Sequence, residues 1–108
     1  MALDLPEAIE LYFTAENRED AGILPHCFAP DAVVYDEGRS IEGLPAIAEW
    51  NAAAKAKYQH SIEPLSTAPR DGKIVVTAKV SGNFPGSPVA LEFAFGLRDR
   101  LISTLEIH

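Results

Sequence analysis

Two hydrophobic periodicities divide the chain. Between residues 5 and 13, apolar side chains recur three and four positions apart, which predicts a helix that begins after Asp4. From residue 73 onward they alternate with polar side chains, as strands do, and the clearest such stripe is Val89, Leu91, Phe93, Phe95 and Leu97. The first half is therefore predicted to be mainly helical and the second half to consist of strands.

The remaining elements follow from turn residues and caps. Asp20 can cap a short second helix that ends near Phe28, and the segment between Gly38 and Gly43 is predicted to be irregular. A third helix and five strands complete the prediction, at 44–58 for the helix and at 32–36, 60–67, 73–84, 89–97 and 101–107 for the strands. Helices followed by a meander indicate an α+β class, with three N-terminal helices packed on one face of a curved, mostly antiparallel sheet.

Length and composition limit the possible classes of protein. The chain has 108 residues, the size of one domain, so residues 1–108 are expected to form a single unit. Sixteen acidic residues against nine basic ones give a net charge of −7, which disfavours nucleic acids and anionic membranes as partners. The single cysteine, Cys27, excludes an internal disulfide framework and fits a cytoplasmic location. No spacing typical of a metal or cofactor site is present, so neither is expected.

Several local motifs, in their order and spacing, resemble one known superfamily. They are CFAPDAVVYD at 27–36, Gly43 to Ile47 with Trp50, GNFPGSP at 82–88, and FAFGL at 93–97 followed by LISTL at 101–105. The chain resembles the nuclear transport factor 2-like superfamily, and most closely its SnoaL-like branch, which is related to ketosteroid isomerases. The resemblance implies a cone-shaped half-barrel, a deep pocket for a small apolar ligand, and a homodimer formed through the outer face of the sheet.

The resemblance also implies a site. Ketosteroid isomerases use an Asp at the end of the first strand as general base and a Tyr of the first helix in the oxyanion hole, and these fall on Asp36 and Tyr12. Their third group, a protonated Asp, falls near Phe93, which cannot donate a hydrogen bond. The implied activity is cofactor-independent proton transfer on an apolar carbonyl compound, as in an isomerase or a cyclase. The alternative is a non-catalytic ligand-binding or dimerisation module of the same fold.

The residues themselves leave both readings open. Asp36 has the strand parity of Ala32 and Val34, so it is expected to face the interior, although a carboxylate at a strand end also commonly accepts backbone N–H groups. Tyr12 on an apolar helix face is either a donor to a ligand or a core residue. His60 shares the parity of Ile62 and is expected to point inward and meet Asp36. The predicted pocket lining is Trp50, His60, Phe28, Phe84, Phe93 and Phe95.

Two further features concern reactivity and assembly. A nucleophilic Cys27 is disfavoured, because adjacent residues of a helix point to different sides and His26 cannot activate it. The positions that alternate with the apolar stripe include the small residues Ala90, Ala94 and Gly96. A flat sheet face of small residues can pack against a copy of itself, which favours a homodimer.

Overall fold

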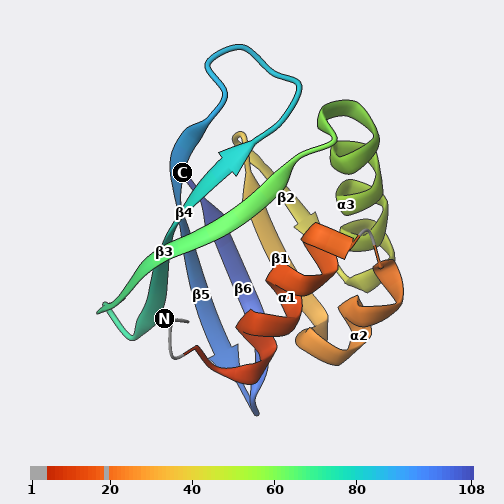
Figure 1. Ribbon diagram of the computed structural model, residues 1–108. Coiled ribbons are helices and arrows are strands. Elements are labelled where there is room, and N and C mark those ends of the chain that lie inside the picture. The colour runs from red at the N-terminus through yellow and green to blue at the C-terminus, as the bar shows by residue number, and fades with distance from the viewer. Residues whose placement is uncertain (1–4, 19) are drawn as a thin grey trace.

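The computed structural model describes residues 5–18 and 20–108. Its elements are α1 (Glu7–Arg18), the 3₁₀ turn η1 (Ala21–Ile23), α2 (Leu24–Cys27), β1 (Phe28–Asp36), β2 (Arg39–Glu42), α3 (Leu44–Tyr58), β3 (Ser61–Arg70), β4 (Lys73–Ser81), β5 (Val89–Arg98) and β6 (Leu101–Ile107) (Figure 1). The predicted cap of the first helix, Asp4, lies outside the described residues.

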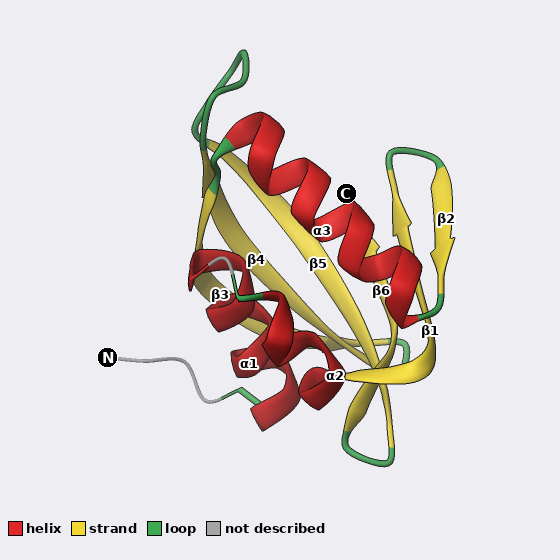
Figure 2. Ribbon diagram, turned by 90° about the vertical axis from the view of Figure 1, so that its right-hand side faces the viewer, coloured by secondary structure: helices red, strands yellow, loops and turns green. Residues whose placement is uncertain are grey.

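The strands form one open, mixed sheet in the order β2-β1-β6-β5-β4-β3. β1 runs parallel to β6, and the other neighbouring strands are antiparallel. The sheet curves, and α1 and α3 lie on its concave side (Figure 2). The α+β class and the mostly antiparallel sheet are thus confirmed. The three helices all lie within the first 58 residues, but the β1–β2 hairpin separates α2 from α3.

The segment predicted to be irregular forms a strand instead. β2 pairs with the end of β1, with Ile41 opposite Val34 and Arg39 opposite Asp36. The turn between them places Glu37 at φ 52° and Gly38 at φ 77°. Two successive left-handed residues make the tight turn whose twist suits a hairpin, and this turn allows the strand to form. β1 also begins four residues earlier than predicted, at Phe28 rather than at residue 32, and β4 ends at Ser81 rather than at Phe84.

The second helix is shorter than expected because its first turn has 3₁₀ geometry. The Asp20 carboxylate accepts a hydrogen bond from the Gly22 N–H at 3.0 Å, as predicted for a cap. Pro25 lies in the first turn of α2, where its missing N–H is tolerated. The short helix ends at Cys27 and brings the chain directly into β1.

The core lies between α1, α2 and the concave face of the sheet. Its centre is an aromatic cluster in which the Tyr12 ring contacts Phe13, Phe28 and Phe95 edge-on, with ring centroids 5.3, 5.8 and 5.6 Å away. Edge-to-face contacts of this kind each add roughly 0.5–1.5 kcal/mol beyond the burial of apolar area. The cluster therefore fixes the position of the Tyr12 ring against the sheet.

Candidate active site

A cavity of about 280 Å³ lies between α1, α3 and the concave face of the sheet. Its wall is mostly apolar. The polar side chains on it come from α1, from α3, from the end of β1 with the residue after it, and from the residue just before β3. An apolar cavity of about 150 Å³ is large enough for benzene, so this one has room for a bicyclic molecule. The lining residues are Tyr12, Glu16, Asp36, Glu37, Trp50, Asn51, Ala54, Tyr58, His60, Ile62, Val80, Phe84, Val89, Leu91, Phe93 and Ile107.

Asp36 ends β1 with its side chain on this wall, on the same side of the strand as the buried Ala32 and Val34. The side chain is half-buried, and its Oδ2 accepts a hydrogen bond from the Trp50 indole Nε1–H at 3.0 Å. The indole thereby fixes one carboxylate oxygen and leaves the other, Oδ1, for a ligand. The sequence did not predict this partnership, because 14 residues and the unpredicted strand β2 separate the two side chains.

Tyr12 contributes a neutral hydroxyl. The residue is 1% exposed, and burial, followed by the nearby Glu16 and Asp36 carboxylates, raises its pKa well above the ordinary 10.0. The phenol therefore keeps its proton and acts as a donor. No hydrogen bond links this hydroxyl to another described residue, and no buried polar side-chain atom in the described part of the chain lacks a partner. Tyr12 is among the residues that line the cavity, and the hydroxyl is its only polar side-chain atom.

A second polar group on the wall joins α1, α3 and the start of β3. The Glu16 Oε2 lies 2.5 Å from the His60 Nε2, and its Oε1 accepts a hydrogen bond from the Asn51 side-chain amide. All three residues are buried, at 3%, 8% and 7% exposure for Glu16, His60 and Asn51. The expectation that His60 would meet Asp36 is thus wrong: its imidazole is bound to Glu16, which lies one helical turn after Tyr12 on the same face of α1.

The backbone around His60 holds this imidazole in place. α3 ends at Tyr58, the following Gln59 is left-handed at φ 47°, and Lys55 Nζ donates to the His60 carbonyl. Gly82 packs directly on this segment, since a Cβ there would lie 2.7 Å from the Tyr58 carbonyl oxygen and 3.0 Å from the His60 Cα. Only glycine permits this close approach. His60 therefore lies between two fixed backbone segments.

The predicted pocket residues divide into two groups. Trp50, His60, Phe84 and Phe93 line the cavity, whereas Phe28 and Phe95 do not. Both of the latter have 0% exposure, because the rings of Tyr12 and Phe13 lie over them. Sequence reasoning missed Glu16 and Asn51. The spacing of Tyr12 and Glu16 by four residues was the signal that could have identified the first of them.

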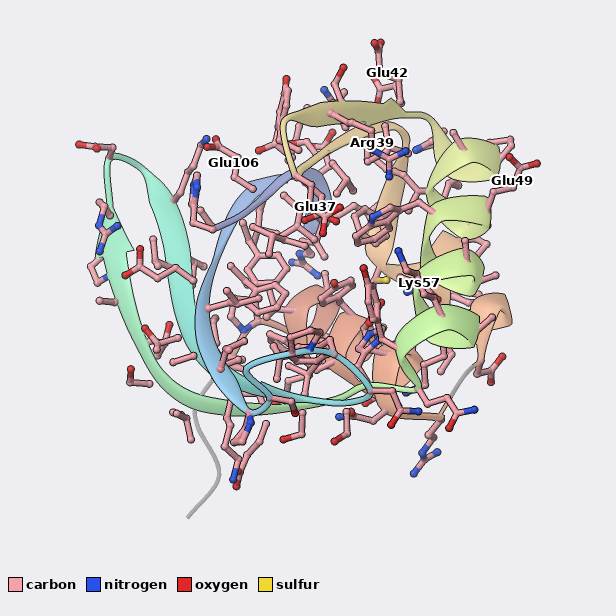
Figure 3. All side chains as sticks on the ribbon, turned by 90° about the horizontal axis from the view of Figure 1, so that it is seen from above. Glu37, Arg39, Glu42, Glu49, Lys57 and Glu106 are labelled. Atoms are coloured by element: carbon pink, nitrogen blue, oxygen red, sulfur yellow. The ribbon has the colours of Figure 1, made fainter. Side chains whose placement is uncertain are left out.

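A groove of about 490 Å³ continues from the cavity to the surface between the β1–β2 hairpin and α3. Asp36 and Trp50 line both spaces, so their hydrogen bond lies at the boundary between them. Around the groove, Figure 3 shows Glu37 and Arg39 on the hairpin and Glu49 and Lys57 on α3. A ligand that reaches Asp36 from solvent can pass through this charged opening before it meets the apolar wall.

Other chemistry receives little support from the described residues. Burial raises the pKa of the Cys27 thiol to about 12, so the thiolate needed by a nucleophile does not form near neutral pH. Among residues 5–18 and 20–108, no three His, Cys, Asp or Glu side chains are grouped as a metal site requires. None of the described helices is both long and apolar enough to span a bilayer.

Comparison with known protein families decides the classification. The model of the SnoaL-like domain matches residues 9–100, which is most of the chain. The chain belongs to the SnoaL-like domain family. A search of curated proteins finds no significant match to this sequence.

Solved structures agree with this family. A protein from Sinorhizobium meliloti named "putative polyketide cyclase" is 46% identical, with 97% of this chain and 96% of that one covered and a TM-score of 0.92. A protein from Catenulispora acidiphila with a ketosteroid isomerase-like fold, in complex with trimethylamine, is 18% identical (97% and 86% covered, TM-score 0.82). A SnoaL-like protein from Agrobacterium tumefaciens, named "putative isomerase", is 15% identical (93% and 92% covered, TM-score 0.76). The SnoaL-like resemblance is confirmed, and the last two share the fold alone.

Proposed function

We propose that this SnoaL-like protein is a cofactor-independent isomerase or cyclase that transfers protons on a small apolar carbonyl compound. The observation that carries the proposal is one apolar cavity on whose wall Asp36 and Tyr12 both lie, each with an oxygen that no other described side chain occupies. The polyketide cyclase name of the 46% identical relative supports the same class of reaction.

The two residues divide the work between carbon and oxygen. Oδ1 of Asp36, beside the apolar wall of the cavity, takes a proton from the carbon next to the carbonyl. The resulting negative charge moves to the carbonyl oxygen, where the Tyr12 hydroxyl stabilises it by donating a hydrogen bond. Trp50 keeps the carboxylate pointed at the cavity by binding Oδ2. The proton then returns to a different carbon in an isomerisation, or a new carbon–carbon bond forms in a cyclisation.

Proton exchange into a bicyclic ketone tests this proposal. β-Tetralone in deuterium oxide is followed by proton NMR, and the wild-type protein is expected to accelerate the loss of its α-proton signals. Asp36→Asn keeps the acceptor for Trp50 but removes the base, so the acceleration should fall by about 10²–10⁴. Asp71→Asn, in the exposed β3–β4 turn, is the matched control and should behave as wild type. Undiminished exchange by Asp36→Asn would refute the assignment.

The alternative is a non-catalytic module that binds an apolar ligand in the same cavity. The apolar wall favours it as much as it favours an enzyme. Under this alternative β-tetralone binds with saturation, and its α-protons exchange no faster than in free solution. The exchange measurement therefore separates the two functions without knowledge of the natural ligand.

We also propose that the protein forms a homodimer through the outer face of the sheet. This face is flat where it carries the small residues Ala90, Ala94 and Gly96. Two of its charged side chains, Arg70 and Glu92, form an ion pair with each other. Sedimentation should give the mass of two chains for wild type and of one for Ala94→Lys. A monomeric wild type would exclude the dimer.

The lone, unpaired Cys27 supports residence in the cytoplasm, and residues 1–108 are proposed to act as one domain.

A further inference from the structure

The Glu16–His60 pair is the second titratable cluster on the cavity wall, and the reaction above leaves it unused. Both side chains are more than nine-tenths buried, and both line the cavity. Burying ionisable groups costs several kcal/mol unless they are paired and fully hydrogen-bonded, and apolar residues would fill the same space at lower cost. A polar pair at this point on an otherwise apolar wall therefore calls for a functional explanation.

The hydrogen bonds of the pair occupy both Glu16 oxygens and one nitrogen of the His60 ring. The Asn51 Nδ2 can only donate, so Glu16 Oε1 is an acceptor. The His60 Nε2 lies 2.5 Å from Oε2, so the two atoms share a hydrogen. Both carboxyl oxygens of Glu16 are therefore engaged. The ring nitrogen that Glu16 does not engage is Nδ1.

The His60 Nδ1 is left for a ligand. No hydrogen bond joins it to another described residue, and His60 lines the cavity. Tyr12 lines the same cavity, one helical turn before Glu16. The cavity therefore presents one base, Asp36, and two separate groups able to donate to an oxygen.

We propose that His60 is a second acid–base residue of this cavity, which exchanges a proton through Nδ1 with the carbonyl oxygen while Asp36 exchanges the proton on carbon. Glu16 is a positioning residue that orients the imidazole, and Asn51 positions Glu16. This inference rests on the proposed function. In ketosteroid isomerases a protonated Asp is the second donor to the carbonyl oxygen, and its position falls near Phe93, which cannot donate. Here the His60–Glu16 pair takes that role.

The proton balance closes without a co-reactant. Asp36 takes a proton from the α-carbon, the C–H electron pair becomes the carbon–carbon double bond, and the carbonyl π pair moves to oxygen. The oxygen takes the Nδ1 proton from the His60 imidazolium, which leaves an enol and a neutral imidazole that still binds Glu16. The reverse transfers, with Asp36 returning its proton to another carbon, restore both groups. The favoured substrates are therefore ketones that react through a neutral enol.

A pair of benzisoxazoles tests the role of His60. In this ring opening a base removes the C–H proton, the nitrogen–oxygen bond breaks, and its electrons leave on a phenolate oxygen. A nitro group stabilises that phenolate, so the nitro-substituted probe needs little help from a proton donor, whereas the unsubstituted probe needs it. His60→Gln should lower kcat/KM for the unsubstituted probe about tenfold more than for the nitro probe. The exposed His26→Gln is the matched control and should leave both values at the wild-type level.

The outcomes separate this inference from the proposed function. Asp36→Asn should slow both probes by similar factors, and if it slows neither, the base assignment fails. If Asp36→Asn is inactive but His60→Gln slows both probes equally, His60 is merely structural and this inference fails. Glu16→Gln, which can still bind both neighbours, should show the selective loss of His60→Gln in weaker form. An unchanged ratio of the two probes in Glu16→Gln would overturn its positioning role.

Binding supplies a readout that does not depend on turnover. Phenol serves as the probe, because its hydroxyl mimics the enol oxygen. In nitrogen NMR of histidine-labelled protein, saturating phenol should shift the Nδ1 resonance of His60 and leave those of His26 and His108 in place. A His60 Nδ1 resonance that stays unchanged at saturation would overturn the proposal even if neither benzisoxazole is turned over.

Discussion

Replacing Glu16 with leucine tests whether the buried polar group on the cavity wall has the connections described. Leucine has a similar size but no oxygen, so the Asn51 Nδ2 and the His60 Nε2 both lose their acceptor. Each buried polar group left unsatisfied costs about 1–3 kcal/mol, so the free energy of unfolding should fall by about 2–6 kcal/mol. Domains of this kind have a total stability of about 5–15 kcal/mol, and the loss would be a large part of it.

Urea unfolding measures this loss. With a slope of about 1–2 kcal/mol per M, the midpoint should fall by roughly 1 M or more while the slope stays the same. Glu10→Leu, on the exposed face of the same helix, is the matched control and should change stability by no more than about 0.5 kcal/mol. A Glu16→Leu protein as stable as the control would show that the carboxylate does not hold these two partners.

A triple variant tests whether Glu16, Asn51 and His60 form one network. Glu16→Leu with Asn51→Leu and His60→Phe leaves no polar side chain of the group behind. It should therefore recover part of the loss, because the cost of the single change comes from unpaired donors rather than from missing bonds. If the three changes lowered stability by the sum of the single losses, the group would not act as one network.

Three further predictions concern other parts of the molecule. Gly82→Ala should lower the free energy of unfolding by about 1–3 kcal/mol and shift the NMR signals of His60. The added methyl meets backbone atoms of Tyr58 and His60, which cannot rotate away as a side chain can. Unshifted His60 signals would contradict the close approach. Tyr12→Phe keeps the ring contacts and loses only the hydroxyl, so β-tetralone exchange should slow by about 10²–10³ with little change in stability by urea unfolding. For Cys27 the folded pKa of about 12 lies above the ordinary 9.0. Above pH 9 the unfolded thiol therefore ionises first, and stability should fall as pH rises. In Cys27→Ala, the free energy of unfolding in urea should fall less steeply above pH 9 than it does in wild type. The same pH dependence in both proteins would refute the raised pKa of Cys27.

Local sequence signals predicted the elements well where one periodicity decides the structure. Helix α1 and the strand beginning at Val89 have the clearest apolar repeats, with a helical period in α1 and a period of two in the strand. β2 was missed because its four residues have too short an apolar pattern, and only its pairing with β1 makes it a strand. Long-range pairings of this type leave no periodic signal in the sequence.

The candidate site shows the same division. The resemblance to ketosteroid isomerases singled out Asp36 and Tyr12 as candidates, and strand parity and helix spacing predicted only the side that each faces. The hydrogen-bond partners on the cavity wall could not be predicted. The Trp50–Asp36 and Glu16–His60 contacts depend on how α1 and α3 tilt over the sheet. His60 lies in the connection before β3 rather than in the strand, so parity with Ile62 gave the right side but the wrong partner.

The central claim is that Asp36 removes a proton from carbon inside the cavity. The most direct measurement compares the rates at which wild type and Asp36→Asn release deuterium from α-deuterated β-tetralone into ordinary water. We predict saturable, catalysed release by wild type, with a primary isotope effect, and a rate lower by about 10²–10⁴ in Asp36→Asn. Release at the wild-type rate by Asp36→Asn, or no catalysed release by wild type, would contradict this claim.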